Sequence, residues 1–190
     1  MARFLDLPQN GEDWLAWRRT RITATDAAVI MGESRFSTPL DLYHKKISGD
    51  EILDNPAMAR GREFEQEALL WFQTNHGGVL KPVCAEHDSI PWMAASIDGW
   101  DFFTNSAIEV KIPTAKNYKF AEVPPFYHLL QMQHQMHVLS IGQMNYVVYS
   151  PEKKDGYVIH VTKDSDLVDR MLKAEEDFYR CLISYKVPAG

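Results

Sequence analysis

The order of strand-like and helix-like segments constrains the fold of this chain more than any other feature. Three short apolar or alternating segments occupy its middle, and each is bounded by Pro, Gly, Asn or Ser. Segments of this kind are typical of β-strands. Two further strands flank a Lys-Lys-Asp-Gly turn later in the chain. The five expected strands cover residues 79–85, 92–98, 107–112, 145–149 and 157–161.

Helix signals surround these strands. A Ser, Thr, Asp or Asn residue accepts hydrogen bonds from the free amides of a first helical turn, proline suits the first position, and glycine ends the last turn. These signals predict helices at residues 25–32, 38–49, 55–77, 125–140 and 164–185. Helices that precede, interrupt and follow a group of strands indicate an α/β fold in which helices pack on a mixed sheet.

Size and composition narrow the class of protein. The 190 residues favour a single domain, and the 20 basic and 26 acidic residues give a net charge of −6, which argues against a polyanion-coating protein. No apolar run is long enough to span a membrane, and the first residues lack the apolar core of a signal peptide, so we expect a cytoplasmic protein without a membrane partner. Cys84 and Cys181 are too few for an all-cysteine metal site and are expected to be buried thiols.

The segment Ile108-Glu109-Val110-Lys111-Ile112 carries the most chemical information. Alternate residues of a strand share a face, so Glu109 and Lys111 point away from the apolar side chains. Upstream, Asp98 ends a strand, and Gly99 is expected to turn the chain. The connection that follows is long enough for the two strands to lie side by side, which would bring Asp98 next to Glu109.

Two neighbouring carboxylates repel each other unless a cation holds them. Mg²⁺ suits this arrangement, because it is usually bound by one or two carboxylates together with substrate phosphate. Lys111, on the same face, would then orient a water molecule and neutralise the charge that develops at phosphorus. A charged pair on an exposed strand face is also common in proteins that bind no metal. With Asp98 included, however, the pattern favours metal-dependent phosphodiester hydrolysis.

The pattern Asp-x10-Glu-x-Lys resembles the PD-(D/E)XK nuclease superfamily, with Ile97 in place of proline. Five separated blocks, over residues 14 to about 150, are similar to the lambda exonuclease family, also called YqaJ-like viral recombinases. The blocks are Trp14 to Asp26, Arg35, Arg60 to Glu65, Ser96 to Lys111 and Tyr127 to Gln133. The resemblance implies a restriction-endonuclease-like core, with a mixed central β-sheet flanked by helices, and a single domain over residues 1–190.

The resemblance also implies a metal site. Asp98 and Glu109 would hold Mg²⁺, or Mn²⁺, together with the backbone carbonyl of Val110, and Lys111 would position the hydrolytic water. Two further residues of the family site match Glu65, which would reach the metal through water, and Gln131, which would border it. Glu65 also fits a solvated acidic run, and Gln131 fits a polar helix face shared with Gln135.

A second group would bind DNA. Arg18, Thr25 and Arg35 match residues that bind a terminal 5′ phosphate, and arginine offers phosphate a fork of donors. Between residues 14 and 46, six basic residues outnumber three acidic ones. Thr25 is also expected to cap its helix, a role compatible with phosphate binding. By resemblance, Met58 would act as an apolar wedge at the duplex end, and Lys116 and Lys119 would lie near a DNA-contacting loop.

The resemblance implies a Mg²⁺-dependent 5′-to-3′ exonuclease acting on linear double-stranded DNA with a 5′ phosphate. It would leave 3′ single strands for recombination beside a single-strand annealing protein, as a toroidal homotrimer in a bacterial host, encoded by a phage or prophage. Alternatives are an endonuclease or junction-resolving nuclease of the same fold, and an inactive DNA-end-binding scaffold. Three histidines in the helix at 125–140, His128, His134 and His137, are expected on its polar face rather than at a zinc site.

Overall fold

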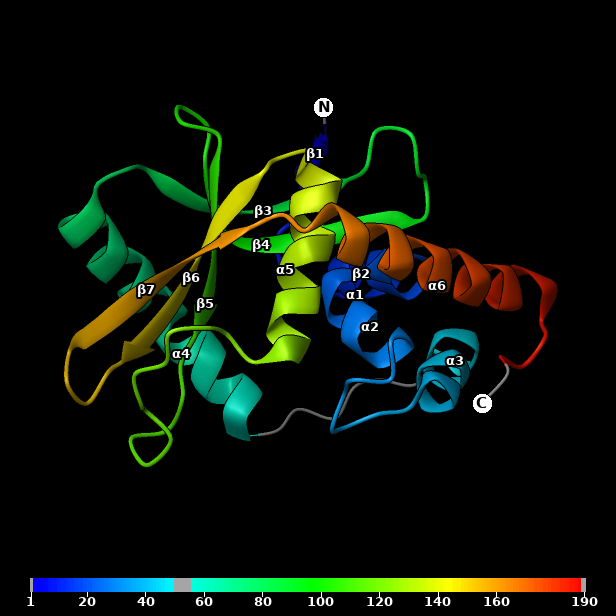
Figure 1. The fold of residues 1–190 in the computed structure, drawn as a ribbon, viewed down its shortest axis with the longest axis horizontal. Helices are drawn as coiled ribbons and strands as arrows, with labels where there is room; N and C mark the ends of the chain where they lie inside the picture. Colours follow the sequence, from blue (N-terminus) through cyan, green and yellow to red (C-terminus); the bar gives the residue numbers. More distant parts are fainter. Residues whose placement is uncertain (1, 50–55, 189–190) are drawn as a thin grey trace.

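The computed structural model describes residues 2–49 and 56–188, which fold around one mixed β-sheet (Figure 1). In this part of the chain the sheet order is β1-β3-β4-β5-β6-β7, and the two-residue strand β2 lies beside β4. The pairs β2–β4 and β5–β6 are parallel, and the other pairs are antiparallel. The strands are β1 (Arg3–Leu5), β2 (Ile22–Thr23), β3 (Leu80–Glu86), β4 (Met93–Asp101), β5 (Ser106–Lys111), β6 (Gln143–Ser150) and β7 (Asp155–Thr162).

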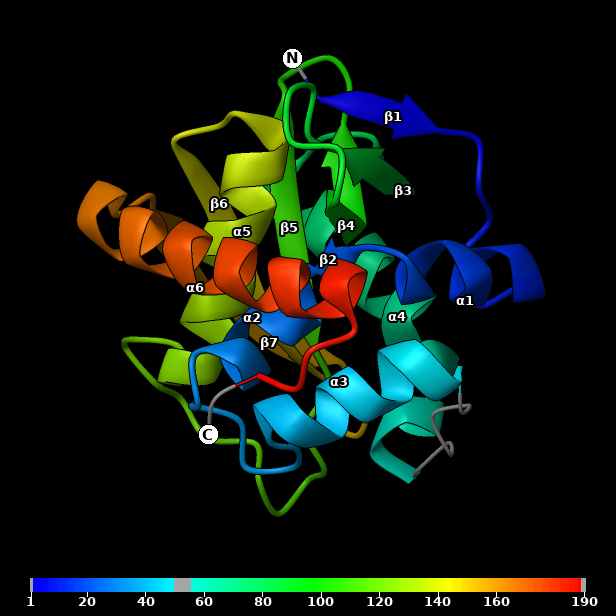
Figure 2. The ribbon, with the colours of Figure 1, turned by 90° about the vertical axis from the view of Figure 1, so that its right-hand side faces the viewer.

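Helices cover both faces of the sheet. Helix α4 packs against β5, β6 and β7 on one face, and α5 packs on the other face, where α2 and α6 lie outside it (Figures 1 and 2). The helices are α1 (Glu12–Arg19), α2 (Ala24–Ile30), α3 (Pro39–Ser48), α4 (Pro56–His76), α5 (Phe126–Leu139) and α6 (Ser165–Ser184). The expected mixed α/β architecture is confirmed. None of the helices in the described ranges is long and apolar enough to cross a membrane.

The helix ends follow their capping residues. Thr38 caps α3, and Gly49 ends it with a left-handed φ of 75°, as the sequence predicts. Asp164 caps α6 by accepting a hydrogen bond from the amide of Leu167. The prediction for α2 was wrong by two residues, because its N-cap is Thr23, and Thr25 lies within the first turn. Asn55, expected to open α4, lies outside the described residues.

Gly99 does not turn the chain. It lies inside β4, which continues to Asp101, and the turn comes at residues 102–105, where the Asp101 carboxylate accepts a hydrogen bond from the Phe103 amide at 2.8 Å. A Cβ atom at Gly99 would lie only 2.8 Å from Ile108 Cγ1 and 3.1 Å from Leu69 Cδ2. Glycine is therefore favoured here, because side chains from α4 and β5 pack closely on the β4 backbone.

Four polar side chains in the middle of α5 are buried, which corrects the expectation of a polar outer face. The sheet lies on one side of the helix and α2 and α6 lie on the other, so Gln131, Gln133, His134 and Gln135 are each at most 9% exposed. Gln133 binds the Thr162 carbonyl and the Asp164 amide. His134 lies between Glu175 Oε1 at 2.8 Å and the Ala94 carbonyl at 2.9 Å. These polar groups therefore join α5 to its neighbours, with partners far away in the sequence.

The cysteine expectation is half right. Both thiols are free, and Cys84 is fully buried between β1 and β4, whereas Cys181 on α6 is partly exposed.

Replacement of Gly99 tests the close packing of α4 on the sheet. Gly99→Ala is expected to lower the free energy of unfolding by about 1–3 kcal/mol, because the neighbouring side chains have to move. The control is Gly61→Ala in α4, where an added Cβ meets no atom within 4 Å and where alanine should stabilise the helix by up to about 1 kcal/mol. Urea unfolding followed by circular dichroism measures both changes. Equal effects at the two positions would contradict the packing argument.

Candidate active site

The strands β4 and β5 part at the position of the predicted acidic residues. Their pairing runs from Asp101–Ser106 to Gly99–Ile108 and ends there. One residue further, the Val110 amide donates to Asp98 Oδ2 at 2.8 Å, so a side chain replaces the strand partner. Strand β5 stays paired with β6 as far as Lys111. The structure thus brings Asp98, Glu109 and Lys111 together at a fork between two strands.

Glu109 is the most enclosed acid of this group, with 2% of its surface exposed. Lys111 Nζ contacts Glu109 Oε1, and Gln131 Nε2 donates to the same oxygen at 2.6 Å. Gln135 Nε2 donates to Glu109 Oε2, also at 2.6 Å. Both carboxylate oxygens are therefore held by donors, which fixes the orientation of the side chain. Gln131 and Gln135, one turn apart on α5, share this role and do not form a solvent-facing polar stripe.

The negative charges at the fork act on one another. Burial raises the pKa of Asp98 well above its usual range, and the neighbouring Glu109 and Glu65 carboxylates add to the rise. Burial and Glu109 likewise raise the pKa of Glu65, which α4 brings to the edge of the cluster. Burial opposes the charge of Lys111, but Glu109 and Asp98 outweigh it and raise the pKa of that ammonium. An excess of acid around one protonated lysine favours an added cation.

The donor set suits a hard divalent ion. No group of three or more His, Cys, Asp or Glu side chains within residues 2–49 and 56–188 is arranged as a ready-made metal cage. Mg²⁺ needs no such cage, because it keeps several waters and is usually held by one or two carboxylates and substrate phosphate. Asp98, Glu109 and the Val110 carbonyl provide oxygen donors of this kind. The Val110 side chain packs in the core on the α4 side.

His128 and Tyr146 form a contact near Lys111 that the sequence did not predict. His128 Nδ1 is 2.7 Å from the Tyr146 hydroxyl, and Tyr146 pairs with Glu109 across the β5–β6 ladder. Burial and the nearby Lys111 charge lower the pKa of His128 to about 3, so its ring is neutral near pH 7. A neutral imidazole avoids a second positive charge beside the lysine. The sequence around His128, with Tyr127 before it and Leu129 after it, does not predict the contact with Tyr146.

Two of the three predicted phosphate-binding residues contact each other. Arg18 Nη2 donates to Thr25 Oγ1 at 2.8 Å, so the structure brings these two residues together. Arg35 instead lies 5.9 Å above the ring centre of Tyr127, at the start of α5. Arg18 also stacks on Trp14, whose indole donates to Ser96 Oγ at 2.8 Å. Since Ser96 precedes Asp98 by two residues, this chain of contacts fixes α1 relative to the acidic strand.

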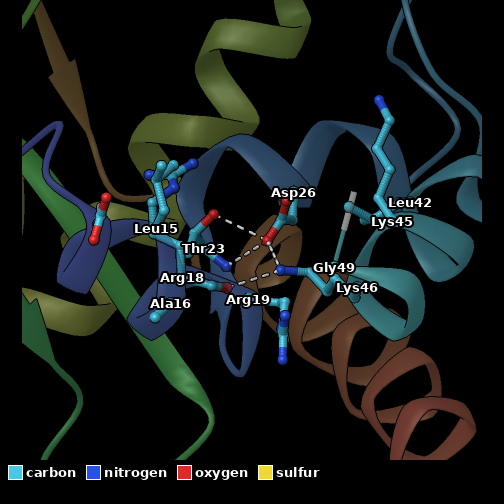
Figure 3. A pocket seen from close by; sticks show the side chains of 11 residues that line it. Leu15, Ala16, Arg18, Arg19, Thr23, Asp26, Leu42, Lys45, Lys46 and Gly49 are labelled. Carbon is cyan, nitrogen blue, oxygen red and sulfur yellow. Dashed lines mark hydrogen bonds and ion pairs between the residues drawn. The ribbon is translucent and has the colours of Figure 1, made fainter. Parts of the chain in front are cut away.

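A cavity of about 300 Å³ lies between α1, α2 and α3, and Arg18, Arg19 and Lys45 are among its lining residues (Figure 3). At its base, Lys46 Nζ contacts Asp26 Oδ2 at 2.9 Å and the carbonyls of Arg18 and Arg21. Asp26 also accepts from the amide and hydroxyl of Thr23. This buried pair, which was not predicted, fixes the start of α2 beside Arg18.

The remaining predicted DNA-binding residues lie outside the carboxylate cluster. Met58, in the first turn of α4, is 39% exposed, and Lys116 and Lys119 are exposed in the loop between β5 and α5. Arg60 connects the start of α4 to the loop after β5, since its guanidinium donates to the Pro113 carbonyl at 3.3 Å. The same guanidinium pairs with Glu152. The start of α4 and the first residues of this loop are therefore neighbours.

Solved structures share this fold. An alkaline exonuclease from Laribacter hongkongensis superimposes with a TM-score of 0.76 over 92% of this chain and 94% of that chain, at 24% identity. A second crystal structure of that exonuclease, in complex with dAMP, matches over the same shares with a TM-score of 0.75 and 25% identity. A phage-related exonuclease from Haemophilus somnus 129PT matches with a TM-score of 0.66 and 15% identity, over 87% of this chain and 96% of that chain. These likenesses show that the chain has the fold of these exonucleases.

The sequence profile of the YqaJ-like viral recombinase domain matches residues 13–141, and the chain belongs to this family. The uncharacterized protein YqaJ of Bacillus subtilis (strain 168) is 24% identical over 186 residues, which cover 88% of this chain and 55% of that protein. The uncharacterized protein R354 of Acanthamoeba polyphaga mimivirus is 21% identical over 192 residues, covering 92% of this chain and 35% of that protein. The chain thus spans between about a third and about half of these relatives.

Replacement of Asp26 tests the buried pair beside the cavity. Burial opposes ionisation of Asp26, but Lys46 and Arg18 outweigh it and lower the pKa of the carboxyl. Its stabilising effect is therefore present above the unfolded pKa of about 3.9 and is lost as the pH falls through the lower folded pKa. Asp26→Asn should lower the free energy of unfolding at pH 7 by roughly 3–5 kcal/mol, because it leaves Lys46 buried without a counter-charge.

Urea unfolding at neutral and at acidic pH measures this effect. The deficit of Asp26→Asn relative to the natural chain should shrink as the pH falls. Asp41→Asn, which alters the exposed capping acid of α3, serves as the control and should have a smaller effect at pH 7. A deficit that stays the same at all pH values would show that the charge pair is not its cause.

Proposed function

We propose that this chain is a Mg²⁺-dependent exonuclease that digests one strand of linear double-stranded DNA from a phosphorylated 5′ end. The observation that carries the proposal is the fork at which Asp98, Glu109 and Lys111 meet in a buried, acid-rich setting. Membership of the YqaJ-like family and the fold shared with exonucleases support it. The product would be a duplex with a 3′ single-stranded end.

Asp98, Glu109 and the Val110 carbonyl are the proposed ligands of Mg²⁺, and Mn²⁺ would fit the same oxygen donors. When bound, such an ion polarises a phosphate and lowers the pKa of a coordinated water. Protonated Lys111 orients the attacking water and neutralises the negative charge that grows on the phosphate oxygens. Gln131 and Gln135 keep the Glu109 carboxylate aligned, and Glu65 accepts a hydrogen bond from water at the edge of the site.

Arg18 and Thr25 are proposed to bind the 5′ phosphate. The guanidinium supplies a planar set of donors, and the hydroxyl 2.8 Å away adds another polar contact to the same oxygens. Arg35 would approach the same phosphate from the side of Tyr127. Binding of a terminal phosphate would set the direction of digestion, because each strand carries this group at its 5′ end and not at its 3′ end. Met58 would separate the first base pair, and Lys116 would contact the duplex backbone.

The assembly and the partner are proposed from the family resemblance. A toroidal homotrimer would enclose the DNA, which suits a chain with a net charge of −6, because enclosure retains a substrate without many phosphate contacts. A single-strand annealing protein would then bind the exposed 3′ strand. In this setting the chain would act in the cytoplasm of a bacterial host, encoded by a phage or prophage.

Replacement of Glu109 tests the chemistry. Glu109→Gln should reduce Mg²⁺-dependent nucleotide release from linear duplex DNA by at least about a hundredfold, because a charged oxygen ligand is lost. DNA binding, measured by fluorescence anisotropy in EDTA, should persist. Glu63→Gln, an exposed acid of α4, is the matched control and should release nucleotides at the normal rate. Unchanged release in the Glu109 variant would refute the assignment, and a natural chain that binds DNA ends but releases nothing would be a scaffold.

Replacement of Arg18 tests the polarity. The natural chain should digest a 5′-phosphorylated duplex faster than one with a 5′ hydroxyl, and Arg18→Gln should remove this difference, which we expect to be about tenfold or more. Release of a 5′ label and a 3′ label is followed on the same duplex. Arg180→Gln, an exposed arginine of α6, is the control. Cleavage of closed circular duplex, or equal rates at both kinds of end, would instead favour an endonuclease.

A further inference from the structure

One exposed and two partly buried aromatic rings meet between the β6–β7 hairpin and the loop after β5. Phe120, in that loop, is 73% exposed, and its ring centre lies 5.1 Å from that of Tyr157 on β7. The ring centre of Tyr118 lies 6.0 Å from that of Tyr157. We call Tyr118, Phe120 and Tyr157 the aromatic ledge. Neither Lys111 nor the acidic fork explains why a phenylalanine is exposed here.

The ledge is held in place by specific contacts. The Tyr157 hydroxyl donates to the Lys119 carbonyl at 2.7 Å, which fastens the loop to the sheet edge. Lys153 Nζ lies 4.8 Å from the centre of the Tyr118 ring. The amides of Asn117 and Tyr118 both donate to the Thr114 carbonyl, which closes a turn just before the rings. A surface that is ordered before binding loses less entropy when a ligand binds.

Basic side chains flank the rings in a chain that is acidic overall. Four exposed lysines belong to the two segments that form the ledge, namely Lys116, Lys119, Lys153 and Lys154. Three acids accompany them, Glu122, Glu152 and Asp155, and Glu152 is paired with Arg60. Lysines beside exposed aromatic rings are typical of surfaces that bind single-stranded nucleic acid, where bases stack on the rings and phosphates meet the ammonium groups.

The position of the ledge relative to the fork indicates which strand it would meet. The Arg18–Thr25 pair is linked through Trp14 to β4, whereas Tyr157 lies on β7, beyond β5 and β6 in the sheet. The fork at β4 and β5 therefore lies between the two. The loop that bears Phe120 begins directly after Lys111, and Figure 1 shows it beside the tip of the β6–β7 hairpin.

We propose that the aromatic ledge binds unpaired bases of the DNA strand that is not cut. Stacking on an exposed ring requires a base whose face is free, which a paired base inside a duplex does not offer. This inference rests on the proposed function, because digestion of one strand generates such bases next to the fork. The ledge would hold the growing 3′ single strand away from the site and keep it from pairing again.

The test measures the affinity of the chain for a labelled oligothymidine of about 16 nucleotides, by fluorescence anisotropy in EDTA. Phe120→Ala should raise the dissociation constant by about fivefold or more, since one stacked base contributes about 1–3 kcal/mol. Phe120→Trp should retain affinity, because it also presents a ring. Phe103→Ala, an 85% exposed phenylalanine at the β4–β5 turn, is the matched control and should change affinity by less than about twofold.

The possible failures can be told apart. If the natural chain does not bind the oligonucleotide, or if Phe120→Ala binds it as tightly as Phe103→Ala does, the ledge has no such role, whatever the nuclease assay shows. If Phe120→Ala forms an assembly of different mass in solution from the natural chain, without a change in affinity, the ledge would be an interface between copies of the chain. This result would overturn the proposal. If the natural chain releases no nucleotides but its oligonucleotide binding still depends on Phe120, only the proposed exonuclease activity would be contradicted.

Discussion

The buried carboxylate of Glu109 is the interaction on which the rest of the structure depends. An ionised group at 2% exposure is costly unless donors surround it, and its three donors come from β5 and from two turns of α5. Helix α5 must therefore lie on the sheet at one height and one rotation. Met132 and Met136 of the same helix pack into the hydrophobic core. One helix therefore contributes both to the core and to the candidate active site.

Helix α5 distributes its buried polar side chains among three neighbours. Gln131 and Gln135 serve the acidic fork, Gln133 holds the junction of β7 and α6, and His134 joins β4 to α6. Burial opposes protonation of His134, but Glu175 and the Ala94 carbonyl outweigh it and raise the pKa of the imidazole. The charged form of the pair therefore stabilises the fold at low pH and loses this effect as the pH rises through the raised pKa. Besides its contacts with Glu109, α5 therefore makes a second buried polar contact, between His134 and Glu175.

Features that depend on local sequence could be predicted, and features that depend on distant partners could not. Alternation predicted β3 to β7 and caps predicted most helix ends, but the short strands β1 and β2 and helix α1 were missed. The connection after Asp98 predicted its approach to Glu109. Gly99 was misread because its neighbours Leu69 and Ile108 constrain it by contact, which no turn pattern encodes. Gln135 and the Asp26–Lys46 pair were missed for the same reason. The sequence alone does not distinguish a polar helix residue that faces water from one that faces another part of the protein.

The pairing of His134 with Glu175 also affects how the chain matures during synthesis. The fork, α5 and β4 are all made before residues 165–184, so the emerging chain contains every proposed catalytic group while the imidazole still lacks its acidic partner. Domains fold as units, and a buried polar group without its partner disfavours the packed state. The acidic fork would therefore reach its fully packed form only after residues 165–184 have been synthesised.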